Sequence, residues 1–277
     1  MNQILDNELF IFDLDGVIYE GSKPIANAIQ SLCKLHELGK KIAFFTNNAT
    51  QSPKTFALKV SAMGYKCSEE QIFTSASICG SALSLEYPKE SKAFIIGENG
   101  LSASLSSNGF KVINDDFSFD EIIENKNIIS SMVIVGLDRD VSYKKFAAAT
   151  QLIARGAHFY ASNTDATLPE VHGLLPGAGS LVSFMMTATG KEPLHVFGKP
   201  HPEGIYQILK KYITARNKAV MIGDRINTDI MSGKNANINT ALALTGVMTA
   251  ANLVDTPHEK FPDWILPDLS ALFSSGQ

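Results

Sequence analysis

The sequence has little cysteine and contains no long apolar run. Its 277 residues include three cysteines, Cys33, Cys67 and Cys79, and this odd number without a paired spacing favours a reducing compartment over a disulfide framework. No apolar run reaches the roughly 18 residues that a membrane-spanning helix needs, and no leader-like segment precedes Phe10. We therefore expect a soluble, cytoplasmic protein that does not bind membranes.

An excess of positive charge is also lacking. The 24 Lys and Arg residues are outnumbered by 28 Asp and Glu residues, so the net charge is −4 and no basic field is available to attract nucleic acid. The six His residues are scattered without the spacing of a zinc site. We therefore expect neither a nucleic-acid partner nor zinc. Hydrophobic residues make up 45% of the chain, which is enough for two buried sheets at this length.

The most informative stretch is Phe10 to Val17, where an apolar, strand-like run leads into Asp13-Leu14-Asp15-Gly16. Open α/β folds bind their ligands at the carboxyl ends of such strands. Alternate residues of a strand point to opposite faces, so Asp13 and Asp15 can share one site only if the chain leaves the strand between them, which Gly16 makes easy. Taken alone, the stretch is explained equally well as a strand followed by an Asp-Gly turn.

Three further apolar runs each lead directly into a polar side chain. These runs are Ile42–Phe45 before Thr46, Val196–Gly198 before Lys199, and Ala219–Ile222 before Gly223 and Asp224. Each polar residue by itself is more often a turn residue or a helix cap, but four residues of complementary chemistry after four such runs are hard to explain as caps. We predict that the four runs are adjacent parallel strands of a Rossmann-like sheet with helices on both faces.

This set of side chains suits phosphoryl transfer to water through an enzyme carboxylate. Asp13 would be the nucleophile that forms an aspartyl-phosphate, and Mg²⁺ held by Asp13 and Asp224 would bring the anionic phosphate against it. The groups that would hold the transferring oxygens are the Thr46 hydroxyl, the Asn47 backbone amide and the Lys199 ammonium. Asp15 would act as general acid to the leaving oxygen and then as general base to water.

In their order along the chain, these motifs resemble those of the haloacid dehalogenase (HAD) superfamily. They are DLDGV at Asp13–Val17, TNN at Thr46–Asn48, GKP at Gly198–Pro200 and GDRINTDI at Gly223–Ile230. The resemblance covers nearly the whole chain and implies the same catalytic roles for the aspartates. It also implies that the Asp15 backbone carbonyl is a metal ligand and that Asp229 supports the Mg²⁺ shell. Dehalogenases of the superfamily lack the second acid, so Asp15 favours a phosphatase or phosphotransferase.

The interval between Thr46 and Lys199 is far longer than one βα unit needs, so it must hold an inserted domain. We predict an inserted α/β cap domain at 82–192 and a core domain formed by 1–81 and 193–277. By its motifs the chain is similar to the type-two-capped branch. That branch holds 4-nitrophenylphosphatases, phosphoglycolate and pyridoxal phosphatases, and the NagD-like phosphatase of N-acetylglucosamine operons.

Within the insertion, the segment 163–179 is expected to select the substrate, because the resemblance implies that this stretch faces the active site of the core. Asn163, Asp165 and His172 are the candidate selecting residues. An alternative of nearly equal weight is that Asp165 caps a turn and His172 is a solvated loop residue. The segment contains no Arg, which a dianionic leaving group would favour.

These observations predict a Mg²⁺-dependent phosphatase of small phosphomonoesters. Sugar phosphates, nucleoside monophosphates, phosphoglycolate, glycerol phosphate and pyridoxal phosphate all agree with the sequence. The alternative is an inactive relative that binds a metabolite or a partner without turnover. A homo-oligomer is left open.

Overall fold

A computed structural model describes residues 3–170, 173–253 and 256–274 of the chain, which divides into two units. The core unit comprises Met1–Thr46, Pro53–Phe73 and Lys199–Gln277, and the inserted unit comprises Asn47–Ser52 and Thr74–Gly198. The inserted unit therefore extends beyond 82–192 at both ends, and it takes in a short segment, 47–52, that the sequence analysis assigned to the core.

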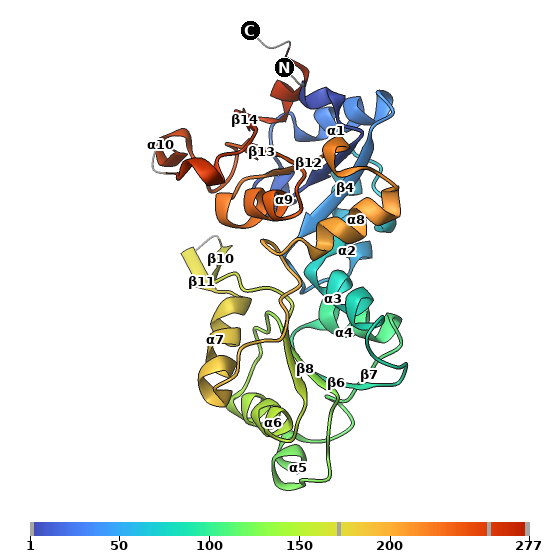
Figure 1. The fold of residues 1–277 in the computed structure, drawn as a ribbon, viewed down its shortest axis with the longest axis vertical. Helices are drawn as coiled ribbons and strands as arrows, with labels where there is room; N and C mark the ends of the chain where they lie inside the picture. Colours follow the sequence, from blue (N-terminus) through green and yellow to red (C-terminus); the bar gives the residue numbers. More distant parts are fainter. Residues whose placement is uncertain (1–2, 171–172, 254–255, 275–277) are drawn as a thin grey trace. The chain divides into compact units, whose positions relative to one another are not determined.

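The core unit is built on a sheet with the strand order β14-β13-β12-β1-β4-β5 (Figure 1). Its strands are β1 (Leu9–Phe12), β4 (Lys41–Thr46), β5 (Ile72–Thr74), β12 (Ala219–Gly223), β13 (Asn239–Ala243) and β14 (Trp264–Leu266). β1 pairs in parallel with β12 on one side and with β4 on the other. The central strands are continuous apolar runs because both faces of a parallel sheet are buried. The carboxyl ends of β12, β1 and β4 therefore meet at one edge.

Helices cover both faces of this sheet. Phe44 lies in a buried cluster with Leu32 of a helix on one face, whereas the ring of the next residue, Phe45, lies so close to Gly204 that a Cβ there would be 2.3 Å from it. Successive strand residues point to opposite faces, so the two aromatic rings mark two helical layers. The helices are α1 (Ala28–Glu37), α2 (Pro53–Ala62), α8 (Glu203–Tyr212), α9 (Met231–Asn235) and α10 (Ala250–Leu253). A small hairpin joins β2 (Tyr19–Glu20) to β3 (Lys23–Pro24).

The prediction that Val196–Gly198 forms a strand of the core sheet is wrong. Val196 forms a single parallel bridge with Ala161 in the inserted unit, and the Phe197 N–H also donates to the Ala161 carbonyl, at 3.1 Å. The run is thus drawn to the edge of the inserted sheet, and Lys199 comes from the loop that precedes α8. The prediction of adjacent parallel strands is confirmed for β1, β4 and β12.

The inserted unit has its own parallel sheet, with the order β7-β6-β8-β9, and its own apolar core. Its strands are β6 (Lys92–Ile96), β7 (Lys111–Val112), β8 (Met132–Val135) and β9 (His158–Ala161), and an antiparallel hairpin joins β10 (Thr167–Glu170) to β11 (Gly173–Pro176). Its helices are α3 (Ser75–Leu83), α4 (Asn99–Ser107), α5 (Phe119–Glu124), α6 (Tyr143–Ala154) and α7 (Ala178–Thr189). None of the helices in the described ranges is both long and apolar enough to cross a bilayer.

The early start of the inserted unit follows from helix packing. α3 lies so close to α4 that a Cβ at Gly80 would be 2.7 Å from the Ser104 carbonyl oxygen. Thr74 caps α3, because its hydroxyl accepts a hydrogen bond from the Ser77 N–H at 3.0 Å. α3 therefore belongs to the inserted unit, whereas the sequence analysis placed the boundary at residue 81, inside this helix.

Candidate active site

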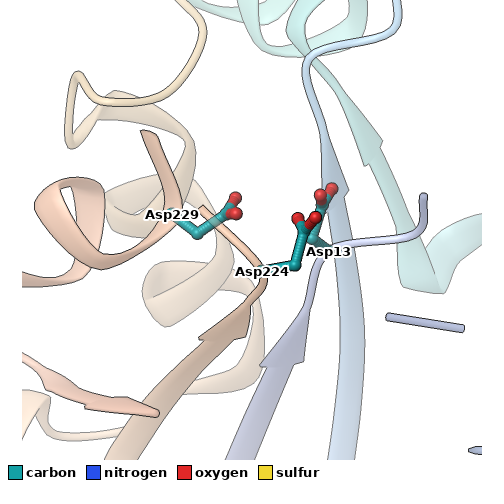
Figure 2. A group of neighbouring side chains, drawn as sticks. All are labelled: Asp13, Asp224 and Asp229. Atoms are coloured by element: carbon teal, nitrogen blue, oxygen red, sulfur yellow. The ribbon is translucent and has the colours of Figure 1, made fainter. Parts of the chain in front are cut away.

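Three buried aspartates meet in the core unit at the carboxyl edge of its sheet (Figure 2). Asp13 directly follows β1, and its N–H still donates to the Ile222 carbonyl of β12 at 2.9 Å. Asp224 follows β12, and Asp229 lies in a short π-helix, Ile226–Ile230. One carboxylate oxygen from each aspartate lies within 4.8 Å of the other two. Such a group of hard oxygen donors suits a divalent cation such as Mg²⁺.

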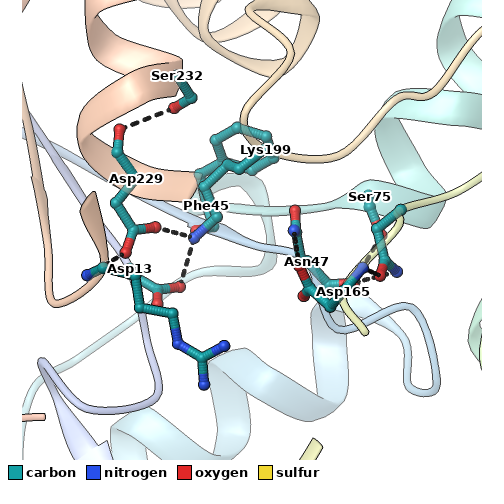
Figure 3. A network of polar contacts seen from close by, with 10 residues as sticks. Asp13, Phe45, Asn47, Ser75, Asp165, Lys199, Asp229 and Ser232 are labelled. Carbon is teal, nitrogen blue, oxygen red and sulfur yellow. Dashed lines mark hydrogen bonds and ion pairs between the residues drawn. The ribbon is translucent and has the colours of Figure 1, made fainter. Parts of the chain in front are cut away.

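The Lys199 ammonium lies among these carboxylates (Figure 3). Its Nζ atom is 2.7 Å from Asp13 Oδ1 and 2.6 Å from Asp229 Oδ1, and it donates to the Phe45 carbonyl at 2.9 Å. The lysine is only 3% exposed. Burial by itself would lower the pKa of Lys199, but Asp13 and Asp229 outweigh burial and raise that pKa above its usual value. The ammonium therefore stays charged.

Asp224 is fixed through one oxygen and open at the other. Its Oδ2 accepts a hydrogen bond from the Val247 N–H at 2.7 Å. Two glycines let the backbone approach this oxygen, since a Cβ would lie 2.1 Å from it at Gly246 and 2.5 Å from it at Gly16. Its Oδ1 is buried and has no hydrogen-bond partner among the described residues. A buried carboxylate oxygen without a partner is costly unless it is protonated or bound to a cation, so the donor set fits a metal ion.

Burial and mutual repulsion raise the pKa values of two of these acids. Burial is the main reason why the pKa of Asp13 lies well above its usual value; Lys199 lowers it, and Asp229 and Asp224 raise it further. Burial likewise raises the pKa of Asp224 to about 6, with Asp229 adding to the rise and the hydrogen bond from Val247 opposing it. One ammonium does not balance three close carboxylates, so a divalent cation would favour their ionised forms.

Asp229 is fixed by several contacts, which involve both of its carboxylate oxygens and its backbone carbonyl. Its Oδ2 accepts a hydrogen bond from the Arg225 N–H at 3.0 Å, and its backbone carbonyl accepts one from the Ser232 hydroxyl at 3.1 Å. Its other oxygen contacts Lys199. The aspartate therefore orients the lysine, and its support of a Mg²⁺ shell stays a prediction.

Asp15 is exposed, in contrast to the buried Asp13, and Thr46 is buried at the end of β4. The chain turns sharply after Asp15, because the Gly16 N–H donates to the Tyr19 carbonyl at 2.9 Å. The sequence analysis required such a turn if the two acids at this strand end are to share one site, and the shared site stays a prediction.

Two residues near Asp15, Tyr19 and Lys59, are not among the predicted site residues. Tyr19 is fully buried, and Lys59 Nζ of α2 lies 3.5 Å from the centroid of its ring. Burial raises the pKa of Tyr19, and the charges of Asp15 and Asp13 raise it further. The position of Tyr19 just after the first motif was a usable signal, but Lys59 lies on a helix far along the chain and no local pattern points to it.

In the inserted unit, Asn47 is surrounded by hydrogen bonds. Its carbonyl accepts from the Ser75 hydroxyl at 2.7 Å and from Asn163 Nδ2 at 2.9 Å, and its own Nδ2 donates to Asp165 Oδ1 at 3.0 Å (Figure 3). Asn163 and Asp165 therefore come together around a predicted phosphate-binding residue. His172 lies outside the described residues. The substrate-selecting role of all three stays a prediction.

A parallel sheet with an acidic cluster and a buried lysine at its carboxyl edge defines an α/β-class protein whose site suits a divalent cation and phosphoryl groups. Residues 10–111 match the model of haloacid dehalogenase-like hydrolases, and residues 196–272 match a model described as HAD-hydrolase-like. The chain belongs to the haloacid dehalogenase-like hydrolase family.

Known relatives cover almost the whole chain. It is 32% identical to the 5′-nucleotidase YutF of Bacillus subtilis over 246 residues, which are 89% of this chain and 90% of the relative. It is 34% identical to phosphoglycolate phosphatase 1A of Arabidopsis thaliana, over 99% of this chain and 78% of the relative. Among solved structures, it resembles a glycerol phosphate phosphatase of Mycobacterium tuberculosis in complex with magnesium, with a TM-score of 0.86 and 30% identity over 98% of this chain and 78% of that one. These relatives are phosphatases named for different small phosphoesters.

Proposed function

We propose that this chain is a Mg²⁺-dependent phosphatase that hydrolyses small phosphomonoesters through an aspartyl-phosphate. The observation that carries the proposal is the contact between Lys199 and Asp13 inside the acidic cluster of Asp13, Asp224 and Asp229. A carboxylate in this position could act as the nucleophile, and the fixed positive charge next to it could bind a phosphoryl oxygen. Relatives named for nucleotide, phosphoglycolate and glycerol phosphate hydrolysis support this substrate class.

In the first half-reaction, an Asp13 oxygen forms a bond to phosphorus while the bond from phosphorus to the leaving oxygen breaks, and Asp15 donates a proton to that oxygen. Lys199 would bind the transferring phosphoryl group. The Thr46 hydroxyl and the Asn47 backbone amide, which are neighbours in the chain, would bind its other oxygens. Mg²⁺ held by Asp13, Asp224 and the Asp15 carbonyl would neutralise charge on the phosphoryl oxygens.

In the second half-reaction, Asp15 accepts a proton from water as the water oxygen bonds to phosphorus. The bond between phosphorus and the Asp13 oxygen breaks, which releases inorganic phosphate and restores the carboxylate. Asp15 therefore ends protonated again, with a proton taken from water in place of the one that left with the first product. Its exposure agrees with a role that exchanges protons with leaving groups and water.

Asp165 and His172 are proposed to meet the leaving part of the substrate. Strand β11, which lies between Asp165 and α7 in the chain, exposes two leucines: Leu174 is 69% exposed and Leu175 is 46% exposed. An apolar surface with few charges suits an uncharged or weakly charged leaving group. Sugar phosphates, nucleoside monophosphates and glycerol phosphate are the classes to test first.

Release of phosphate from 4-nitrophenyl phosphate and from a panel of these metabolites tests the proposal. We expect turnover in Mg²⁺, none in a chelator and none in Asp13→Asn. Asp120→Asn is the control, since Asp120 forms an exposed ion pair with Lys144 far along the chain from the motifs. A folded wild-type protein that binds Mg²⁺ but hydrolyses no ester of the panel would favour the inactive, metabolite-binding alternative and contradict the proposal.

A further inference from the structure

The segment Asn47–Ser52 follows a core strand in the chain but belongs to the inserted unit. The Gly100 N–H at the start of α4 donates to the Thr50 carbonyl at 3.0 Å. A Cβ at Gly100 would lie 2.5 Å from the Ala49 carbonyl oxygen, so the segment packs directly on this helix. The phosphate-binding motif is therefore divided, because Thr46 ends β4 of the core and Asn47 begins a segment of the inserted unit.

The Asn47 carbonyl is fixed from two directions. Ser75, the first residue of α3, and Asn163, which follows β9 closely, both donate to it. A carbonyl oxygen has two lone pairs, so both donors can bind it at once, and they fix the planar peptide between Asn47 and Asn48. The Asn47 N–H, which is the proposed phosphate ligand, belongs to the preceding peptide. It is restrained through the Asn47 Cα, to which the fixed carbonyl and the Asn47 side chain are both attached.

The Asn47 side chain and the Asn163 side chain are fixed by the same group of residues. Asn47 Nδ2 donates to Asp165, and the Asp165 N–H donates to Asn163 Oδ1 at 3.1 Å. Gly198 closes another side, because a Cβ there would lie 2.6 Å from Asn47 Oδ1 and 2.7 Å from Asn163 Cβ. Asn163 is 4% exposed and both ends of its amide are used within the unit, so its side chain is committed to holding Asn47.

We propose that Asn163 is a positioning residue for phosphate binding, acting with Ser75 and Asp165 through Asn47. The inserted unit would then set the geometry of one phosphate-binding residue as well as select the leaving group. This inference rests on the proposed function for the role of Asn47. A selecting residue changes the ranking of substrates, whereas a positioning residue of the phosphate site affects every phosphomonoester and inorganic phosphate alike.

The test compares Asn163→Ala with Asn114→Ala. Asn114 is a matched control, because its amide also makes two hydrogen bonds to backbone atoms of the inserted unit, at 2.9 and 2.8 Å to Ile95. For Asn163→Ala we expect inhibition by inorganic phosphate to weaken about five- to tenfold, the worth of about one hydrogen bond. The kcat/KM for 4-nitrophenyl phosphate and for two metabolite esters should fall by the same factor. Asn114→Ala should lower Tm but leave phosphate inhibition unchanged.

Unchanged phosphate inhibition in Asn163→Ala, or a changed ranking of the esters, would overturn the inference in favour of a selecting role. Equal loss in both variants would reduce Asn163 to a general stabilising residue and would also overturn it. Ser75→Ala, which removes the second donor, is the further variant if Asn163→Ala does not fold, and it should reproduce the uniform loss.

Amide hydrogen exchange of the segment 47–52 separates this inference from the proposed function, since it needs no turnover. We expect faster exchange in Asn163→Ala than in the wild type or in Asn114→Ala. A wild-type protein without phosphatase activity would contradict the proposed function only, whereas exchange rates that are equal in all three proteins would contradict the positioning role itself.

Discussion

The Nζ atom of Lys199 lies 2.7 Å from Asp13 Oδ1, and the two residues are far apart in the chain but both buried in the core unit. The contact joins the proposed nucleophile to the proposed phosphate ligand before any substrate arrives. It also keeps a charge near Asp13 that opposes the effect of burial on its pKa. In the proposed mechanism, nucleophile activation and phosphate binding therefore depend on one ion pair.

Removal of the ammonium in Lys199→Met should lower kcat/KM by about 100-fold or more, the usual cost of losing a group that stabilises a transition-state oxyanion. Lys199→Arg should not restore activity, because a planar guanidinium does not reproduce the three directions in which Nζ meets Asp13, Asp229 and the Phe45 carbonyl. Steady-state kinetics on 4-nitrophenyl phosphate measure both. Lys40→Met is the control, since Lys40 Nζ also donates to two backbone carbonyls of the core unit. Near-normal activity in Lys199→Met would remove the lysine from the mechanism.

Substitution of the two acids of the first motif, Asp13 and Asp15, should impair catalysis at different steps. Asp13→Asn removes the nucleophile, so we expect no phosphoenzyme and no turnover. Asp15→Asn keeps the nucleophile and loses proton transfer, which is typically worth about 10²- to 10⁴-fold, so both formation and hydrolysis of the phosphoenzyme should slow. Rapid-quench measurement of acid-stable protein-bound phosphate distinguishes the two. Equal phosphoenzyme levels in both variants would contradict the division of roles.

Stability without metal should depend on pH through Asp224. Its carboxyl titrates near 3.8 in the unfolded chain, and burial raises the pKa to about 6 in the folded protein. The folded state therefore binds more protons between these values, and the free energy of unfolding in a chelator should fall as the pH rises from about 4 to about 6, by on the order of 2–3 kcal/mol from this group.

Urea unfolding across this pH range, in chelator and in Mg²⁺, checks the expectation. Asp224→Asn should lose this part of the pH dependence. Mg²⁺ should stabilise the wild type more at pH 7 than at pH 5, because the ion binds ionised carboxylates. A metal-free protein that gains stability over this range relative to Asp224→Asn would show that the sign is wrong.

Gly16 should tolerate no side chain. It has φ +80°, and a Cβ would lie 2.5 Å from Asp224 Oδ2. Gly21 is the matched control, since it has φ +58° but nothing within 4 Å of its Cβ position. Each Gly→Ala change pays about 1–2 kcal/mol for left-handed backbone, but only Gly16→Ala should also weaken Mg²⁺ binding and abolish activity. Magnesium titration and thermal unfolding of both variants test this, and equal behaviour of the two would contradict a close packing of Gly16 on the metal ligand.

The sequence predicted the parts of this molecule that depend on local pattern. The buried runs of β1, β4 and β12 were recognisable because parallel strands are apolar throughout, and their polar ends gave Asp13, Thr46 and Asp224. Val196–Gly198 has the same apolar pattern, but tertiary hydrogen bonds to Ala161 take it to the other unit. Periodicity does not encode which sheet edge accepts a short run.

Contacts between distant residues were also beyond the reach of sequence patterns. The donation of Lys199 to the Phe45 carbonyl and of Asn163 to the Asn47 carbonyl both use backbone oxygens, which every residue has. Composition therefore carries no sign of them. The pairing of β10 with β11 inside the expected selecting segment was missed for a similar reason, since the sequence between the two strands is neither Asn-Gly nor Asp-Gly, the signal of tight hairpins.

Because residues 47–52 belong to the inserted unit, they affect how this unit can be exchanged between related proteins. A chimaera that takes only residues 74–198 from a relative would place a foreign Ser75 and Asn163 around the native loop, and a foreign α4 beneath it. A transplant that includes 47–52 moves the loop together with its donors. The inserted unit therefore consists of two separate segments of the chain, one of which is only six residues long. A chimaera that transfers the whole unit needs four junctions between the two parent sequences instead of two.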